Sequence, residues 1–133
     1  MANWTGVSRT NYFQVKDVAA FIEEMERYPV DLLESKQSDG STHYGLGAES
    51  NEGTWPITDE NNDEEVDFPS IVANHLADGE VAVFVSAGSE KLRYVTGHAC
   101  AIDNTGQSVH ISIDDIYIKA KEVFGSEPSP AEY

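Results

Sequence analysis

The sequence predicts an α+β domain in which helices pack on a mainly antiparallel sheet. Three observations predict this class. The chain has 133 residues, the size of one domain. Hairpin connections outnumber crossovers among its strand-like segments. Three further segments place apolar residues at helical spacing. We expect the order β-α-β-β-α-β-β-β-α in a single domain over residues 1–125, followed by a loose tail over residues 126–133.

The first half of the chain predicts one strand, one helix and one hairpin. Residues 9–15 are rich in aromatic and β-branched side chains, which favours a strand. Asp17 can cap a helix whose apolar stripe follows at helical spacing, and Pro29 ends that helix. The turn Ser38-Asp39-Gly40 joins expected strands over residues 30–35 and 42–47. A polar loop over residues 49–67 follows, with Trp55 as the expected anchor on the core.

The second half predicts a helix, three strands and a last helix. Asp67 and Pro69 begin a helix that Asp78-Gly79 closes. Strands are expected over residues 80–86, 91–102 and 107–112, and the first of these is almost wholly apolar, as in a strand covered on both faces. Ser112 and Asp115 resemble a capping box for a helix over residues 113–124. The expected core contains Val81, Val83, Val85, Tyr94, Val109, Ile111, Ile116 and Val123.

Charge is the most unusual property of the composition. The chain has 24 acidic and 8 basic residues, a net charge of −16. This balance excludes direct attraction to a nucleic-acid backbone or an anionic membrane. Over the ~36 Å diameter of such a domain, duplex DNA carries about 20 charges. The carboxylates therefore approach the charge count of a DNA segment, so either solubility or a basic partner explains them.

Half of the carboxylates lie in one stretch. No basic residue occurs between Lys36 and Lys91, whereas twelve acidic residues do. A solvated face and a recognition surface both account for this pattern. As a binding surface we expect the carboxylates of the long loop, which are Glu49, Glu52, Asp59, Glu60, Asp63, Glu64, Glu65 and Asp67. The alternative surface is the acidic side of the first helix, with Glu23, Glu24 and Glu26.

Motifs for metal or cofactor chemistry are incomplete. Asp59-x-Asn61-x-Asp63 begins like a calcium loop, but Glu64 replaces the required glycine and Ser70 the bidentate glutamate. His98-x-Cys100, with His110 opposite across a hairpin, lacks the second ligand pair of a zinc site.

Motifs for covalent catalysis or phosphate binding are incomplete as well. Cys100 has no nucleophile elbow, and Gly45-x-Gly47 lacks the rest of a phosphate loop. We expect His75 to be a packed histidine on the apolar side of its helix. We expect no enzyme, no metal and no cofactor.

Cysteine usage and hydropathy indicate a compartment. The single cysteine, Cys100, cannot form an intramolecular disulfide, which fits a reducing cytoplasm. Residues 1–6 lack the basic segment and apolar run of an export signal, and no apolar stretch approaches ~20 residues. We expect a cytoplasmic protein without a membrane segment.

Three segments carry a resemblance to a known group of proteins. They are SRTNYFQVKD from Ser8, HLADGEVAV from His75 and EKLRYVTG from Glu90. Together they resemble a family of small acidic bacterial proteins carried on phages, plasmids and integrated elements. The matches include no catalytic motif. The resemblance implies a mobile-element context, where acidic proteins of this size are frequently inhibitors of restriction or CRISPR nucleases.

Three functions remain open on the sequence alone. The first is an acidic inhibitor of a basic nucleic-acid-binding host defence complex, acting by DNA mimicry or by another contact mode. The second is an immunity or antitoxin-like protein that neutralises a basic toxin. The third is a metal-dependent enzyme that uses the carboxylates and His98. The first two demand the same acidic face, so the sequence does not separate them.

Overall fold

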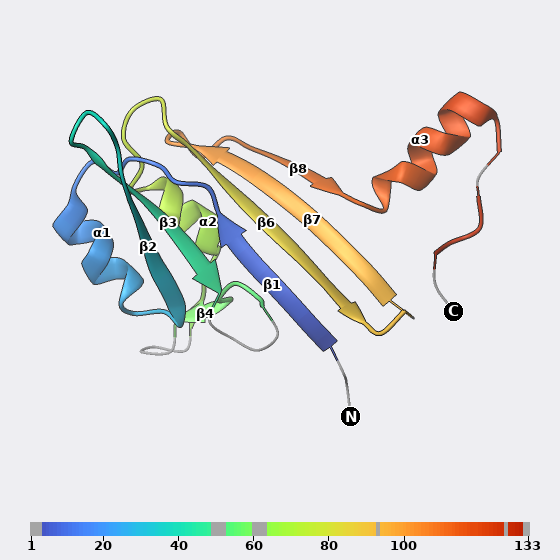
Figure 1. Ribbon diagram of the computed structural model, residues 1–133, viewed down its shortest axis with the longest axis horizontal. Coiled ribbons are helices and arrows are strands. Elements are labelled where there is room, and N and C mark those ends of the chain that lie inside the picture. Colours follow the sequence, from blue (N-terminus) through green and yellow to red (C-terminus); the bar gives the residue numbers. More distant parts are fainter. Residues whose placement is uncertain (1–3, 49–52, 60–63, 93, 127, 132–133) are drawn as a thin grey trace.

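The computed structural model describes residues 4–48, 53–59, 64–92, 94–126 and 128–131. It contains a six-stranded sheet in the order β2-β3-β1-β6-β7-β8, with every neighbouring pair antiparallel. The strands are β1 (Trp4–Thr10), β2 (Val30–Lys36), β3 (Thr42–Ala48), β6 (Val81–Glu90), β7 (Tyr94–Asp103) and β8 (Ser108–Ser112). The helices are α1 (Val18–Met25), α2 (Phe68–Ala73) and α3 (Asp115–Phe124). The predicted α+β class and the order of elements are confirmed (Figure 1).

The long loop contains a small hairpin that the sequence did not predict. Its strands are β4 (Thr58–Asp59) and β5 (Glu64–Glu65), which pair with each other and not with the main sheet. The predicted anchor is confirmed, because Trp55 packs against the core. Its ring stacks on Phe68 at 5.7 Å between centroids and meets Phe84 of β6 edge-on at 5.3 Å.

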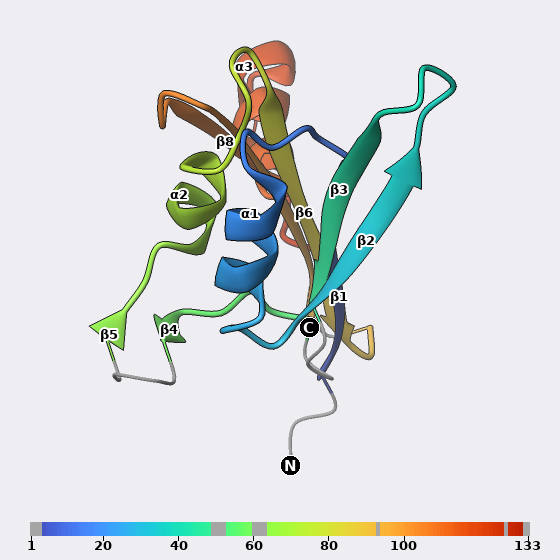
Figure 2. The same ribbon diagram turned by 90° about the vertical axis from the view of Figure 1, so that its left-hand side faces the viewer.

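Helices α1 and α2 cover one face of the sheet (Figure 2). Side chains alternate between faces along a strand, so Ala82 and Phe84 of β6 and Cys100 and Ile102 of β7 all point to that face. The fully buried core combines them with side chains from the helices and β3. Its largest members are Phe13, Phe21, Phe68, Leu46, Leu76 and Val72.

The first strand begins earlier than predicted. The sequence predicts a strand over residues 9–15, whereas β1 ends at Thr10. Beyond it, Asn11 N still donates to Val83 O at 3.2 Å, while the Asn11 side chain donates to Val81 O at 3.1 Å and accepts from Val83 N at 2.8 Å. The chain then departs from the direction of β1. Phe13 and Val15 form only isolated bridges, and Phe13 enters the core.

Most of the predicted core lies on the other face of the sheet and is exposed. Val81 and Val85 are 42% and 47% exposed, and Tyr94, Val109, Ile111, Ile116 and Val123 are exposed as well; Val83 is half-buried. The almost wholly apolar sequence of β6 predicts cover on both faces. Among the described residues, only the face with Ala82 and Phe84 is covered by helices. The core prediction was therefore wrong about the face.

Helix α3 forms as predicted but does not pack on the sheet. Asp115 Oδ2 accepts the backbone N–H of Ser112 at 2.9 Å, as in a capping box, and Gly125 ends the helix in the left-handed region at φ 81°. None of the residues of α3 is buried. The helix lies beyond the end of β8, away from α1 and α2 (Figure 1).

The covered face predicts where stability resides. Phe84→Ala removes an aromatic ring from contact with Trp55 and Phe68, so we expect a loss of about 3–5 kcal/mol in the free energy of unfolding. Ile57 is 75% exposed, so Ile57→Ala is the control, with a change within about 0.5 kcal/mol. Urea denaturation measures both. Equal losses for the two variants would contradict the assignment of the core.

Candidate acidic binding face

The structure describes seven of the eleven carboxylates predicted for partner binding. Glu23 and Glu26 of α1, Glu64 and Glu65 of β5, and Asp67 before α2 are exposed. Glu24 is half-buried and Asp59 is buried. Glu49, Glu52, Glu60 and Asp63 lie outside the described residues.

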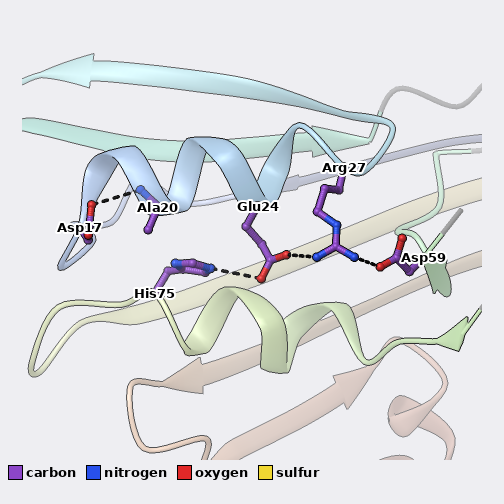
Figure 3. A network of polar contacts seen from close by, with 6 residues as sticks. All are labelled: Asp17, Ala20, Glu24, Arg27, Asp59 and His75. Carbon is purple, nitrogen blue, oxygen red and sulfur yellow. Dashed lines mark hydrogen bonds and ion pairs between the residues drawn. The ribbon is translucent and has the colours of Figure 1, made fainter. Parts of the chain in front are cut away.

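An ion-pair network joins the two predicted surfaces (Figure 3). Arg27, just after α1, pairs with Glu24 Oε2 at 3.1 Å through Nη1 and with Asp59 of β4 through Nη2. On its other side, Glu24 Oε1 lies 3.5 Å from His75 Nε2, which follows α2. The network therefore ties α1 to β4 and to the end of α2.

The carboxylates of the first helix face outward because its apolar stripe faces inward. Phe21 and Met25 are buried against the sheet, and this places Glu23 and Glu26 on the solvent side. Asp17 begins the helix by accepting the backbone N–H of Ala20 at 3.1 Å (Figure 3). The orientation of the acidic side chains thus follows from local sequence.

The two predicted acidic surfaces adjoin. The Arg27 network holds α1 next to β4, and β4 pairs with β5. Both short strands lie on the same side of the sheet as α1 and α2 (Figure 2). We call this surface the acidic face; its exposed carboxylates are Glu23, Glu26, Glu64, Glu65 and Asp67. A hollow of about 200 Å³ on it is lined by Ala20, Glu23, Glu24, Arg27 and His75.

Asp59 and Glu24 have structural partners on this face. The stretch between Lys36 and Lys91 has no cation of its own, but Arg27 supplies one from α1. Burial raises the pKa of the Tyr28 phenol above its ordinary value, and the charges of Glu24 and Asp59 raise it further. The Tyr28 ring packs edge-on against Phe68 at 5.4 Å.

Of the predicted histidine and cysteine positions, His75 and Cys100 are packed, whereas His98 and His110 are exposed. His75 lies edge-on to Phe21 at 5.6 Å, as expected for a packed histidine. Cys100 and His110 face each other across β7 and β8, with Sγ 4.0 Å from Nε2. Burial raises the pKa of the Cys100 thiol, and the charge of Asp67 raises it further, which disfavours the reactive thiolate. Within the described part of the chain, no three His, Cys, Asp or Glu side chains form a metal-binding group.

Sequence reasoning missed Arg27, the cation at the centre of this network. The spacing Glu24-x-x-Arg27 places the two side chains on one side of a helix, so the pair of Arg27 with Glu24 could have been predicted. The other half joins residues 32 positions apart, and no local pattern reports it.

Comparisons of the chain with protein-family models, curated proteins and solved structures give no match. Among the described residues, none of the helices is long and apolar enough to cross a membrane.

The Arg27 bridge can be tested by stability measurements. Arg27→Gln leaves the buried Asp59 carboxylate without its cation, so we expect a loss of about 1–2 kcal/mol in the free energy of unfolding. Arg27→Lys keeps the charge and should lose less. The double variant Arg27→Gln/Asp59→Asn should recover part of the loss, because no buried charge remains. Urea denaturation at neutral pH measures all three, and an unchanged Arg27→Gln variant would contradict a stabilising bridge.

Proposed function

We propose that this protein is an acidic binding protein that inhibits a basic, nucleic-acid-binding complex of a host defence system, such as a restriction or CRISPR nuclease. The observation that supports the proposal is the continuity of the acidic face. The elements that carry its exposed carboxylates, which are α1, β5 and the start of α2, lie on the same side of the sheet (Figure 2).

Electrostatics favours a basic partner over a neutral one. Arg27 lies within this face, but its guanidinium already pairs with Glu24 and Asp59. The net charge of the chain is −16, so one cation already paired in this way leaves the surface strongly negative. Its field steers a basic surface toward the face and raises the association rate at low salt.

Mimicry of nucleic acid is the proposed mode of inhibition. A nucleic-acid groove is lined by Lys and Arg side chains that neutralise phosphates. Carboxylates on a rigid body of domain size offer those side chains an alternative set of acceptors. The inhibitor and the nucleic acid would then exclude each other from the same groove.

Capture from the host at two salt concentrations tests this proposal. The tagged protein is incubated with lysate of a host that carries restriction or CRISPR systems, at ~0.05 and ~0.5 M sodium chloride. We expect retention of a nucleic-acid-binding complex at low salt only, and its release by added duplex DNA. A partner that resists both salt and DNA would refute mimicry. A captured toxin without nucleic-acid-binding activity would favour the immunity alternative.

Charge reversal tests which face of this protein binds the captured partner. Glu64→Lys/Glu65→Lys reverses two exposed carboxylates of β5, so we expect the association rate at low salt to fall about tenfold or more, with a smaller change in dissociation. Glu34→Lys/Glu122→Lys is the matched control, because it changes the net charge equally at exposed positions on β2 and α3. Surface-plasmon kinetics measures both. Equal effects of the two pairs on the association rate would mean that binding depends on net charge and not on this face.

A further inference from the structure

The second face of the sheet is apolar and open. Alternation along β6, β7 and β8 places one set of aliphatic side chains there, with Val85 opposite Ala99 and Ala99 opposite Ile111. The exposed members of this open face are Val7, Val81, Val85, Val95, Val109, Ile111 and Ile113. By our estimate they present on the order of 600 Å², the upper end of the largest apolar patch on a typical monomer (~300–600 Å²).

The open face is also free of charge at its centre. Residues 83–87, 95–101 and 109–113 contain no Asp, Glu, Lys or Arg, in a chain whose net charge is −16. Depletion of charge at the centre of an apolar patch is typical of protein interfaces. Because two copies of this chain repel each other elsewhere, this patch is where they can approach most closely.

Helix α3 supplies a second apolar surface that its own chain leaves uncovered. Ile116, Val123 and Phe124 are 60%, 74% and 78% exposed. A helix of ten residues is marginal in water without tertiary packing, so α3 requires a surface to pack on. The helix is neutral overall, because Lys119 and Lys121 balance Asp115 and Glu122, so it adds little repulsion from an acidic neighbour.

The connection from β8 to α3 is short and directs the helix past the end of the sheet. Only Ile113 and Asp114 separate the strand from the helix, and Ile113 N still donates to Gly97 O of β7 at 2.9 Å. The pairing with β7 therefore continues up to Ile113. The helix then extends beyond β8 (Figure 1), where the open face of another molecule can receive it.

We infer that the chain forms a twofold homodimer in which α3 of each copy packs on the open face of the other. Both surfaces occur in one chain, so two copies can exchange them reciprocally and close as an isologous dimer. A hollow of about 310 Å³ on the open face, lined in part by Val85, Gly97 and Ile111, can receive an apolar side chain such as Phe124. The two surfaces together offer on the order of 1,000 Å² per copy, more than the ~800 Å² of a standard interface.

The mass of the full chain in solution tests the dimer. In sedimentation equilibrium at about 1–100 μM we expect twice the chain mass of 14.6 kDa. Ile111→Glu on the open face and Phe124→Glu on α3 should each weaken association about 100-fold or more, because each buries a charge in the interface. Ile57→Glu is the control. Ile57 is exposed near β4, so this variant should leave the dimer intact. Circular dichroism checks that the variants keep the native fold.

Hydrogen exchange of the unaltered protein gives an independent measurement. We expect the amides of α3 to be protected at high protein concentration and to lose protection on dilution. A monomer at 100 μM would overturn the inference, as would protection of α3 that does not change with concentration. A dimer that persists in Phe124→Glu would overturn the exchange of α3. The inference does not use the acidic face, so its failure would leave the proposed function standing.

Discussion

Packing of aromatic rings against one face of the sheet is the constraint on which the rest of the structure depends. Phe68 of α2 lies in contact with Tyr28, Trp55 and Phe84, and Phe21 of α1 with Phe13 and Tyr44. These contacts hold both helices and the long loop on the same side. They also fix the second face of the sheet as the open one, and they bring α1 and β4 close enough for Arg27 to bridge them. The acidic face and the open face are thus two results of one packing arrangement.

The elements that depend on local signals were predictable. Asp17, Pro29, Gly125 and the turn at Asp39-Gly40 act within a few residues of their own positions, and the helices and hairpins they bound occur where expected. The choice between the two faces of β6 was not predictable, because both carry apolar side chains. That choice depends on rings such as Phe13 and Phe68, which are far away in the sequence.

The candidate site was predictable to a similar extent. Composition indicated an acidic surface, and helical spacing indicated which carboxylates of α1 face outward. The inward position of Asp59 could not be read, because it requires a cation from another element. A carboxylate in a polar loop looks the same in sequence whether it meets solvent or a guanidinium. Only the tertiary structure separates the charges that hold the fold from those that remain at the surface.

The acidic face and the open face lie on opposite sides of one sheet, and this has a consequence for valency. Two copies joined through their open faces would direct their acidic faces away from each other. Such an assembly would be divalent: neither acidic face would be hidden by association, and one assembly could engage two basic sites. On a target with repeated subunits, the second contact would form at a raised effective concentration, so modest affinity at each face would give durable attachment.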